Sequence, residues 1–392
     1  MTRAHRAELG AGGGQMSNRA VREPLAVALA ACVLWGGIVG RAAAAAPDAS
    51  AAAAPVPLYG SVQGTMEAAL PPPSVIGPVD VLAVAPGIEM LSVDGVNLAV
   101  QSGPDGIVVV DPGPAQSAAA VLTAIRRISS EQIHYLIDTN ADAELIGGNA
   151  AIAAAGHSIA VEDLFIAGQR RGFTDLITVP GANGGGGAPI IARQSVLTQM
   201  AGEAGANYGA AAFPTDTFTR PEFNLFANEP IAVVRLPAAH SDADAAVRFE
   251  RSDVVVAGEI FDPTRFPVID LANGGSIRGE VDALNQVINT LVFGRTPVLT
   301  DDPGTRVIPA HGPLGTLDDL VSYRDMVATV MMRVQYYMDR GRSYPQILAA
   351  DPTQGFHTRY GSQTGPWTTA DFVQAVYKSL MSERRARHGQ RG

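Results

Sequence analysis

Side chains that bind metal ions or move protons recur at four places in this sequence, each directly after an apolar run. Carboxylates and imidazoles are the usual protein ligands for divalent cations, and they also serve as general acids and bases. Loops at strand ends are where α/β proteins place their sites, so a shared site at the strand tips is one interpretation of this pattern. The segments are "TNADAELIGGN" with Asn140, Asp142 and Glu144, "LPAAHSDADAAV" with His240, "VVVAGEIF" with Glu259, and "VIPAHGP" with His311.

The competing interpretation is that these polar residues lie separately on the surface. Asp142 and Glu144 precede the short helix expected in "GGNAAIAAAG", where acidic residues complement the helix dipole. Asp242 and Asp244 are expected to be solvated in a turn. Asp111, in "VVVDPG", either caps a turn or orients a ligand from behind, and the sequence leaves both roles open.

The elements around these residues alternate between strands and helices, which predicts a layered α/β fold. Residues 88–101 read as a hairpin with its turn at Asp94-Gly95. Helical spacing of apolar residues predicts further helices, including one that starts with a capping-box-like Thr316 and Asp319. Strands are expected within 106–111, 133–139, 189–193, 222–236, 244–250, 253–258 and 306–310, and helices within 115–128, 194–202, 276–292, 316–341 and 368–390.

The chain divides into four predicted regions. Residues 1–46 resemble a signal peptide, with arginines, an apolar stretch over 25–40 and small residues at the exit, so we expect export to the periplasm or the cell exterior. An uncleaved anchor or a lipid on Cys32 is the second choice. Residues 47–78 are rich in Ala and Pro and predict a disordered linker. An α/β domain over 79–315 and a C-terminal helical extension over 316–392 follow.

Composition limits the classes of partner. The 392 residues are 47% hydrophobic and carry a formal net charge of −10, so we expect a folded core and no nucleic-acid partner. Cys32 is the one cysteine of the sequence, so a chain cleaved near residue 46 has no thiolate ligand or nucleophile. Contact with a membrane is expected only through the N-terminal signal or anchor.

Residues 85–315 resemble the metallo-β-lactamase fold superfamily, which includes glyoxalase II, lactonases and β-lactamases. The landmarks occur in the family's order, from "VVVDPG" through "TNADAELIGGN", "LPAAHSDADAAVRF" and "VVVAGEIF" to "VIPAHGP". The resemblance implies an αββα sandwich, here with the helical extension, and a site where histidines and a bridging Asp hold two zinc ions.

This sequence departs from the family's metal ligands at most positions. His240 and His311 match, whereas Leu145 stands where a histidine is usual. Asn140 and Asp142 replace two histidines, and Glu144 and Glu259 replace aspartates. A standard dinuclear zinc centre is therefore not expected. The remaining set favours one divalent metal, Zn, Mn or Fe, because two imidazoles and several carboxylates form an oxygen-rich site.

Two functions follow from the resemblance, and the sequence leaves both open. In the first, a metal held by Asp142, His240, Glu259 and His311, with Asn140 as a weak amide ligand, activates an ester, lactone, amide or thioester, and Glu144 accepts a proton. In the second, an inactive homologue keeps the cleft to bind a ligand or partner. The first function requires the carboxylates of Asp142 and Glu259 to lie near both imidazoles. Neither the substrate nor the oligomeric state follows from the sequence.

Overall fold

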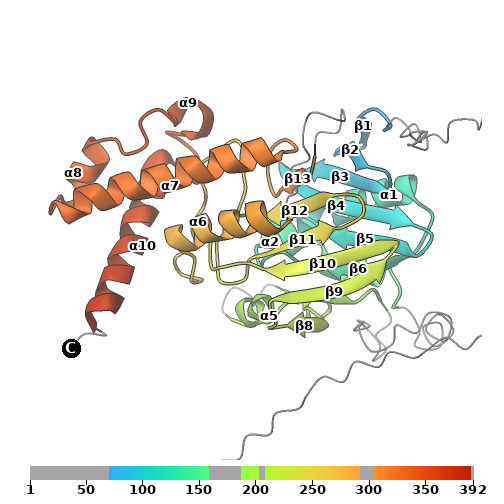
Figure 1. Ribbon diagram of the computed structural model, residues 1–392. Coiled ribbons are helices and arrows are strands. Elements are labelled where there is room, and N and C mark those ends of the chain that lie inside the picture. Colours follow the sequence, from blue (N-terminus) through green and yellow to red (C-terminus); the bar gives the residue numbers. More distant parts are fainter. Residues whose placement is uncertain (1–69, 159–186, 203–207, 292–303, 390–392) are drawn as a thin grey trace, which may run out of the picture. The chain divides into compact units, whose positions relative to one another are not determined.

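Two β-sheets form the centre of the protein (Figure 1). The computed structural model describes residues 70–158, 187–202, 208–291 and 304–389. They belong to one compact unit that begins at Met66. The predicted signal peptide lies outside the described residues, and so does most of the glycine-rich stretch 181–189. No helix in the described ranges is both long enough and apolar enough to cross a membrane.

The first sheet has eight strands in sequence order. Strands β1 to β5 pair antiparallel, and β5 to β8 pair in parallel. The bounds are β1 Ser74–Ile76, β2 Val79–Ala85, β3 Ile88–Val93, β4 Val96–Gly103, β5 Gly106–Val110, β6 Ile133–Ile137, β7 Ile190–Arg193 and β8 Asp216–Phe218.

The second sheet has five strands in the order β13-β12-β11-β10-β9. Its neighbours are antiparallel except for the parallel pair of β12 with β13. The bounds are β9 Glu222–Ala227, β10 Glu229–Arg235, β11 Ala245–Phe249, β12 Val254–Gly258 and β13 Arg306–Pro309.

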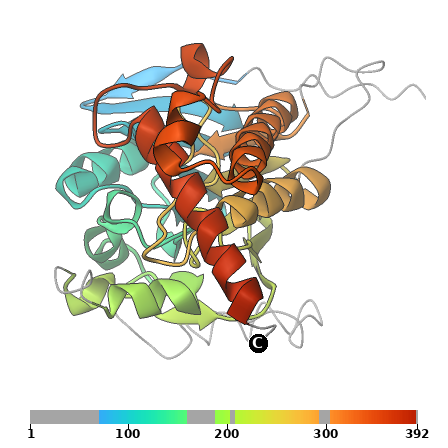
Figure 2. The same cartoon turned by 90° about the vertical axis from the view of Figure 1, so that its left-hand side faces the viewer.

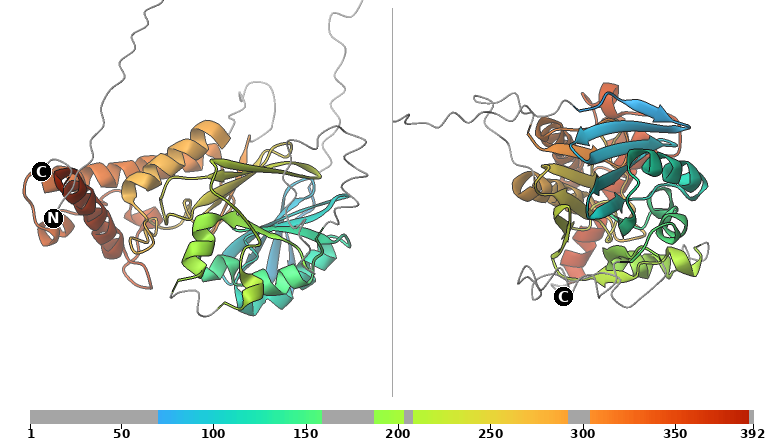
Figure 3. Two further views of the ribbon diagram at one scale, coloured as in Figure 1. Left: turned by 90° about the horizontal axis from the view of Figure 1, so that it is seen from below. Right: turned by 90° about the vertical axis from the view of Figure 1, so that its right-hand side faces the viewer.

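Helices lie on the outer faces of both sheets (Figure 3). On the first sheet, α1 Ala118–Ile128 and α3 Asn149–Ala154 share a buried cluster with the strands. On the second, α6 Ile277–Gln286, α7 Leu317–Asp339 and α10 Thr369–Gly389 share another, and α10 also packs on α6 and α7 (Figure 2). The remaining helical segments are α2 Ala143–Ile146, α5 Gln194–Met200, α8 Tyr344–Ala349, α9 His357–Tyr360, a π-helical turn at Val287–Leu291, and 3-10 turns at Ala115–Ser117 and Ala210–Ala212.

The core between the sheets is built from alternating apolar residues of both, such as Val108 and Ile137 on one side and Val233 and Val247 on the other. Helix, sheet, sheet and helix therefore form successive layers. The predicted αββα sandwich with a C-terminal helical region is confirmed.

One detail of the predicted organisation differs from the structure, and another agrees with it. Strand β1 pairs with β2 inside the range predicted to be a disordered linker, so the ordered domain starts before residue 79. The short apolar stretch "SVI" forms only three paired residues, which leaves little strand pattern to recognise beside so many prolines and alanines. The predicted hairpin is present as β3 and β4, with positive φ at Asp94 and Gly95 as a two-residue hairpin turn requires.

Candidate metal centre

The six candidate residues come from the ends of strands in both sheets. Asp142 and Glu144 follow β6, and His240 follows β10. Glu259 directly follows β12, and His311 lies two residues beyond β13. Because β12 and β13 are parallel neighbours, Glu259 and His311 leave the same edge of the second sheet. The strand ends thus bring residues from distant parts of the chain to one place.

The ligand atoms of five of these residues form two groups that share Glu259. Asp142, His240 and Glu259 make one group, and Glu144, Glu259 and His311 make the other. Within each group, one ligand atom from each residue lies within 4.8 Å of the others. The predicted four-residue ligand set is therefore divided between two triads, with Glu259 as the shared carboxylate.

Backbone carbonyl groups fix the orientation of both imidazoles. His240 Nδ1 lies 2.9 Å from the carbonyl oxygen of Val268, and His311 Nδ1 lies 2.9 Å from that of Gly95. A carbonyl oxygen only accepts hydrogen bonds, so each Nδ1 carries the proton and donates. Each Nε2 then faces the carboxylates, which is the usual arrangement of a metal-binding histidine.

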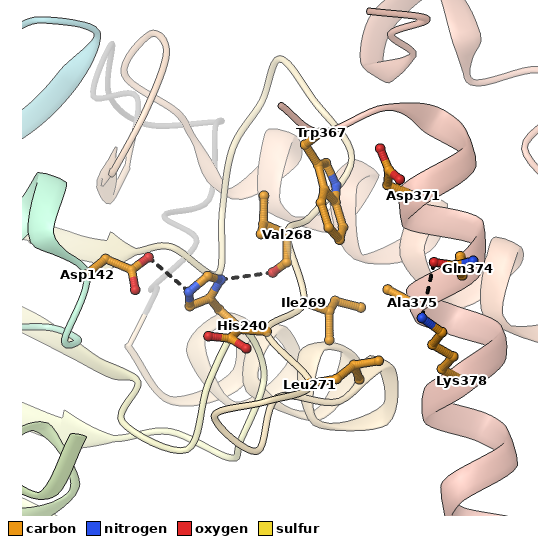
Figure 4. A pocket seen from close by; sticks show the side chains of 11 residues that line it. Asp142, His240, Val268, Ile269, Leu271, Trp367, Asp371, Gln374, Ala375 and Lys378 are labelled. Carbon is orange, nitrogen blue, oxygen red and sulfur yellow. Dashed lines mark hydrogen bonds and ion pairs between the residues drawn. The ribbon is translucent and has the colours of Figure 1, made fainter. Parts of the chain in front are cut away.

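The two Nε2 atoms differ in their contacts. His240 Nε2 lies 3.0 Å from Asp142 Oδ2, an ion pair when the imidazole is protonated (Figure 4). His311 Nε2 is hydrogen-bonded to Glu259 Oε1 at 2.9 Å and lies 3.4 Å from Glu144 Oε1. His240 Nε2 therefore contacts one carboxylate, whereas His311 Nε2 contacts two.

The loop after β6 is held by two buried residues behind the triads. Asn140 Oδ1 accepts a hydrogen bond from the Asp142 backbone nitrogen, and its own Nδ2 has no partner among the described residues. The carboxylate of Asp111 accepts hydrogen bonds from the backbone nitrogen and the hydroxyl of Thr139. Asn140, predicted as a weak ligand, thus positions Asp142, and Asp111 orients the loop.

Asp142 precedes α2 as its N-cap, but its side chain makes no capping hydrogen bond. The carboxylate turns to His240 instead, so dipole capping does not account for this residue.

The turn after His240 is another departure from expectation. Asp242 is exposed as predicted, but Asp244 is 2% exposed and accepts hydrogen bonds from the backbone nitrogens of Ala239 and Ser241. The prediction that Asp244 is solvated is wrong, because these donors replace water and fix the backbone on both sides of His240.

Gly279 allows the start of α6 to pack closely against the loop that carries His240. A Cβ atom on Gly279 would lie 1.7 Å from the carbonyl oxygen of Ala238, so no other residue fits there without movement. Ser276 caps α6 by accepting a hydrogen bond from the Gly279 nitrogen, and its hydroxyl donates to the Ala238 carbonyl oxygen. The helix start and the His240 loop are therefore held together.

Arg265 is a part of the site that sequence reasoning missed. Its guanidinium lies 3.6 Å from Glu259 Oε2 and 2.7 Å from Asp262 Oδ2. The signal available in the sequence was the spacing in "GEIFDPTRF", which puts one cation shortly after two acids. An irregular segment has no periodicity that predicts where such a side chain points.

The charges of the cluster shift the pKa values of both imidazoles. Burial alone lowers the pKa of His240, but Asp142 and other nearby carboxylates raise it well above its usual value. Burial also lowers the pKa of His311, whereas hydrogen bonds to Glu144 and Glu259 raise it to about 10. The hydrogen bond from His311 in turn lowers the pKa of Glu144. A bound cation therefore competes with protons for these side chains.

No family model matches the chain, and no curated protein is significantly similar to it. Solved structures are similar at the level of fold. The stereoselective inverting sec-alkylsulfatase Pisa1 from Pseudomonas sp. has a TM-score of 0.51 and 13% identity, over 76% of this chain and 49% of that one. A double mutant of sec-alkyl sulfatase PisA1 has a TM-score of 0.54 and 12% identity, over 77% and 50%. A metallo-β-lactamase from Pontibacter korlensis has a TM-score of 0.43 and 15% identity, over 63% and 99%.

The chain has the metallo-β-lactamase fold. It spans about half the length of the alkylsulfatases it matches. At 12% and 13% identity the likeness concerns the fold alone.

Within this metallo-β-lactamase fold, Leu145 leaves one usual ligand position without a donor. Leu145 is fully buried in an apolar cluster with Ile146 and Ala192, so it supplies neither a ligand nor a place for one. The triad of Asp142, His240 and Glu259 offers one nitrogen and two carboxylates, a donor set that divalent cations accept. The buried Nε2 of His240, 3.0 Å from Asp142 Oδ2, belongs to the same triad.

Proposed function

We propose that this protein is a metal-dependent hydrolase that binds one divalent cation through Asp142, His240 and Glu259. The observation that carries the proposal is the convergence of these three ligand atoms, with His240 Nδ1 held by the Val268 carbonyl oxygen so that Nε2 faces the carboxylate of Asp142. The similar alkylsulfatase structures are of enzymes that cleave sulfate esters, which supports a hydrolytic reaction for the shared fold.

The second triad supports the first. His311 Nε2 is hydrogen-bonded to Glu259, so the imidazole orients the shared carboxylate. Glu144 is about half exposed and faces the same imidazole, which suits a group that accepts a proton from water or substrate. Arg265 places a positive charge beside Glu259, where it can stabilise negative charge that develops on a substrate oxygen.

When bound, the cation would polarise the scissile group and favour deprotonation of water. The metal is Zn, Mn or Fe, and carboxylate-rich ligation shifts the preference from Zn toward Mn or Fe. The substrate class comprises esters, lactones, amides and thioesters. A standard dinuclear zinc centre is not proposed, because Leu145 replaces a ligand.

Metal content and turnover of matched variants test this function. We expect protein purified without chelator to retain close to one equivalent of metal, and ester or lactone hydrolysis to rise with added Mn²⁺. His240→Ala should lower kcat/KM by roughly 100-fold or more, since losing even a supporting residue of a metal site costs about 10- to 100-fold. His134→Ala is the matched control, because that imidazole contacts the His157 carbonyl away from the site. A content of less than about a tenth of an equivalent of any transition metal in the purified protein would contradict the proposal.

One observation favours a second function, a metal-free binding protein. Arg265 and the two imidazoles, whose pKa values are raised, provide three positive groups beside the carboxylates of Asp142, Glu144 and Glu259. In such a cluster the positive side chains balance the charges of the three carboxylates without a bound metal ion. Unchanged melting temperature on adding Mn²⁺ or Zn²⁺, together with no hydrolysis, would favour this alternative, because a ligand that binds only the folded state raises its stability.

Export is part of the proposal and follows from the sequence of residues 1–46 alone. The mature N-terminus of protein made in a secreting host should lie near Pro47. A mature chain that still begins at residue 1 or 16 would contradict cleavage and favour the uncleaved anchor.

A further inference from the structure

A cavity of about 450 Å³ connects the metal triad to the C-terminal helix α10. Asp142 and His240 line one side of it, and Gln374 and Lys378 of α10 line the other (Figure 4). Ile269, Leu271 and Trp367 lie between these two sides. The volume falls within the range of about 300–1,000 Å³ that is usual for small-molecule sites. A ligand reacting at the triad would therefore extend over an apolar middle toward α10.

The polar groups of the cavity with unused hydrogen-bonding capacity are donors. Trp367 Nε1 is buried and has no acceptor among the described residues. Lys378, the only lysine in the sequence, donates to Gln374 Oε1 at 3.2 Å, and an ammonium group has three hydrogens to donate. Buried indole N–H groups normally have partners, so Trp367 Nε1 lacks an acceptor that a ligand could supply.

Besides Asp142 of the triad, two acidic residues line the cavity, Asp270 and Asp371, and both accept hydrogen bonds from within the chain. Asp270 accepts hydrogen bonds from the backbone nitrogens of Ala272 and Asn273 and from the Asn273 side chain. Asp371 accepts from the backbone nitrogen and the hydroxyl of Thr368. Both carboxylates keep their charge, but part of their accepting capacity is used within the chain, so the unused donors near α10, Trp367 Nε1 and Lys378 Nζ, favour a ligand that carries acceptors.

We propose that the substrate is an amphiphilic ester whose apolar chain ends in an anionic group, and that Lys378 and Trp367 bind that end. The assignment of the reacting end rests on the proposed hydrolase function. The pocket itself does not, because ligand binding at α10 requires no turnover. Lys378 is then the residue that distinguishes anionic substrates from neutral ones of the same length.

Fluorescence of Trp367 reports on the pocket directly. Trp35 and Trp367 are the two tryptophans, so the Trp35→Phe chain has one reporter, which lines the cavity. We expect octanoate to change its emission and to bind about fivefold more tightly than octanol, the effect of one exposed ion pair. Lys378→Met should bring the two affinities close to equality, and Lys378→Arg should keep most of the difference. Arg385→Met removes one positive charge from the exposed face of the same helix and is the control.

Each outcome decides one of the two proposals. Equal affinity for octanoate and octanol, or tighter binding of octylammonium, overturns the inference about the anionic end. An unchanged preference in Lys378→Met, or its loss in Arg385→Met, overturns the role of Lys378. Octanoate binding as expected, with no ester hydrolysed in the presence of metal, leaves the pocket assignment and removes the hydrolase. Hydrolysis of charged and neutral esters at equal rates leaves the hydrolase and removes the assignment of the anionic end.

Discussion

At the scale of single residues, the carboxyl group of Glu280 is the least compensated polar group near the candidate site. Glu280 lies in the first turn of α6 and is fully buried, and neither of its oxygens has a hydrogen-bond partner among the described residues. Burial raises its pKa well above the usual value, and the charges of Asp244 and Glu259 raise it further. Burial therefore favours the neutral form of this side chain in the folded protein.

Glu280 makes stability depend on pH with a definite sign. Its contribution is fully present below the unfolded pKa of about 4.3, and it is lost as pH rises toward the folded pKa, because only the folded state then binds the proton. Glu280→Gln, which stays neutral, should be more stable than the original chain at pH 8, by about 1.4 kcal/mol for each pKa unit of the shift, and the difference should shrink at pH 4.5. Urea unfolding at both pH values measures this. Asp282→Asn, on the same helix, is the control; an equal difference at both pH values would contradict the prediction.

The residues of the candidate site differ in how far the sequence predicts them. Asp142, His240 and Glu259 were predicted because each follows an apolar strand, and the direction of a strand fixes where its end lies. Arg265 and Asp244 were not, since both lie in irregular loops. Whether such a residue is buried depends on which backbone N–H groups donate hydrogen bonds to it in the folded protein. The spacing of residues in the sequence does not predict those donors.

At the scale of elements, the long helix α7 shows how a local signal defines a boundary. Thr316 accepts a hydrogen bond from the Asp319 nitrogen, and Asp319 Oδ2 accepts from the Thr316 nitrogen. This is the capping box that the sequence predicts. The Arg359 guanidinium also contacts Asp319, which links the start of α7 to α9.

Removing this cap should destabilise the protein by a moderate amount. Thr316→Ala leaves the Asp319 nitrogen without its side-chain acceptor, and we expect a loss of about 1 kcal/mol in the free energy of unfolding. Ser322→Ala, at an exposed position within α7, is the matched control and should change stability by less than about 0.5 kcal/mol. Chemical denaturation of the two variants compares them. Equal effects would mean that the start of α7 is held by packing and not by its cap.

At the scale of the whole molecule, the C-terminal helices share one core with the second sheet. Phe372 of α10 is fully buried and stacks on Phe266, with ring centroids 4.7 Å apart. Tyr323 of α7 meets Phe261 edge-on at 5.4 Å. Both phenylalanines lie in the segment that carries Glu259 and Arg265, so the helices hold one wall of the candidate site.

The alternation of strands and helices predicted a layered α/β fold, and the order of the five landmarks predicted the sandwich only through the resemblance to the metallo-β-lactamase fold superfamily. The packing of the C-terminal helices was not predicted. The sequence there shows helical spacing, which identifies an apolar face but not the surface that it covers. In the structure that surface is the segment between Glu259 and Leu271, whose own conformation is irregular.

Phe372 therefore provides a test of whether α10 is integral to the fold. Phe372→Ala should lower the free energy of unfolding by about 3–5 kcal/mol, because it leaves a cavity against Phe266. Phe372→Leu fills most of that volume and should cost much less, and Arg385→Ala, on the exposed side of α10, should cost almost nothing. Guanidinium unfolding followed by circular dichroism measures all three. A single cooperative transition in the original chain, with a loss of this size in Phe372→Ala, makes the helix part of the same folding unit as the sheets. A loss below about 1 kcal/mol, or a separate early transition, would mean that α10 docks weakly and cannot fix the Glu259 segment.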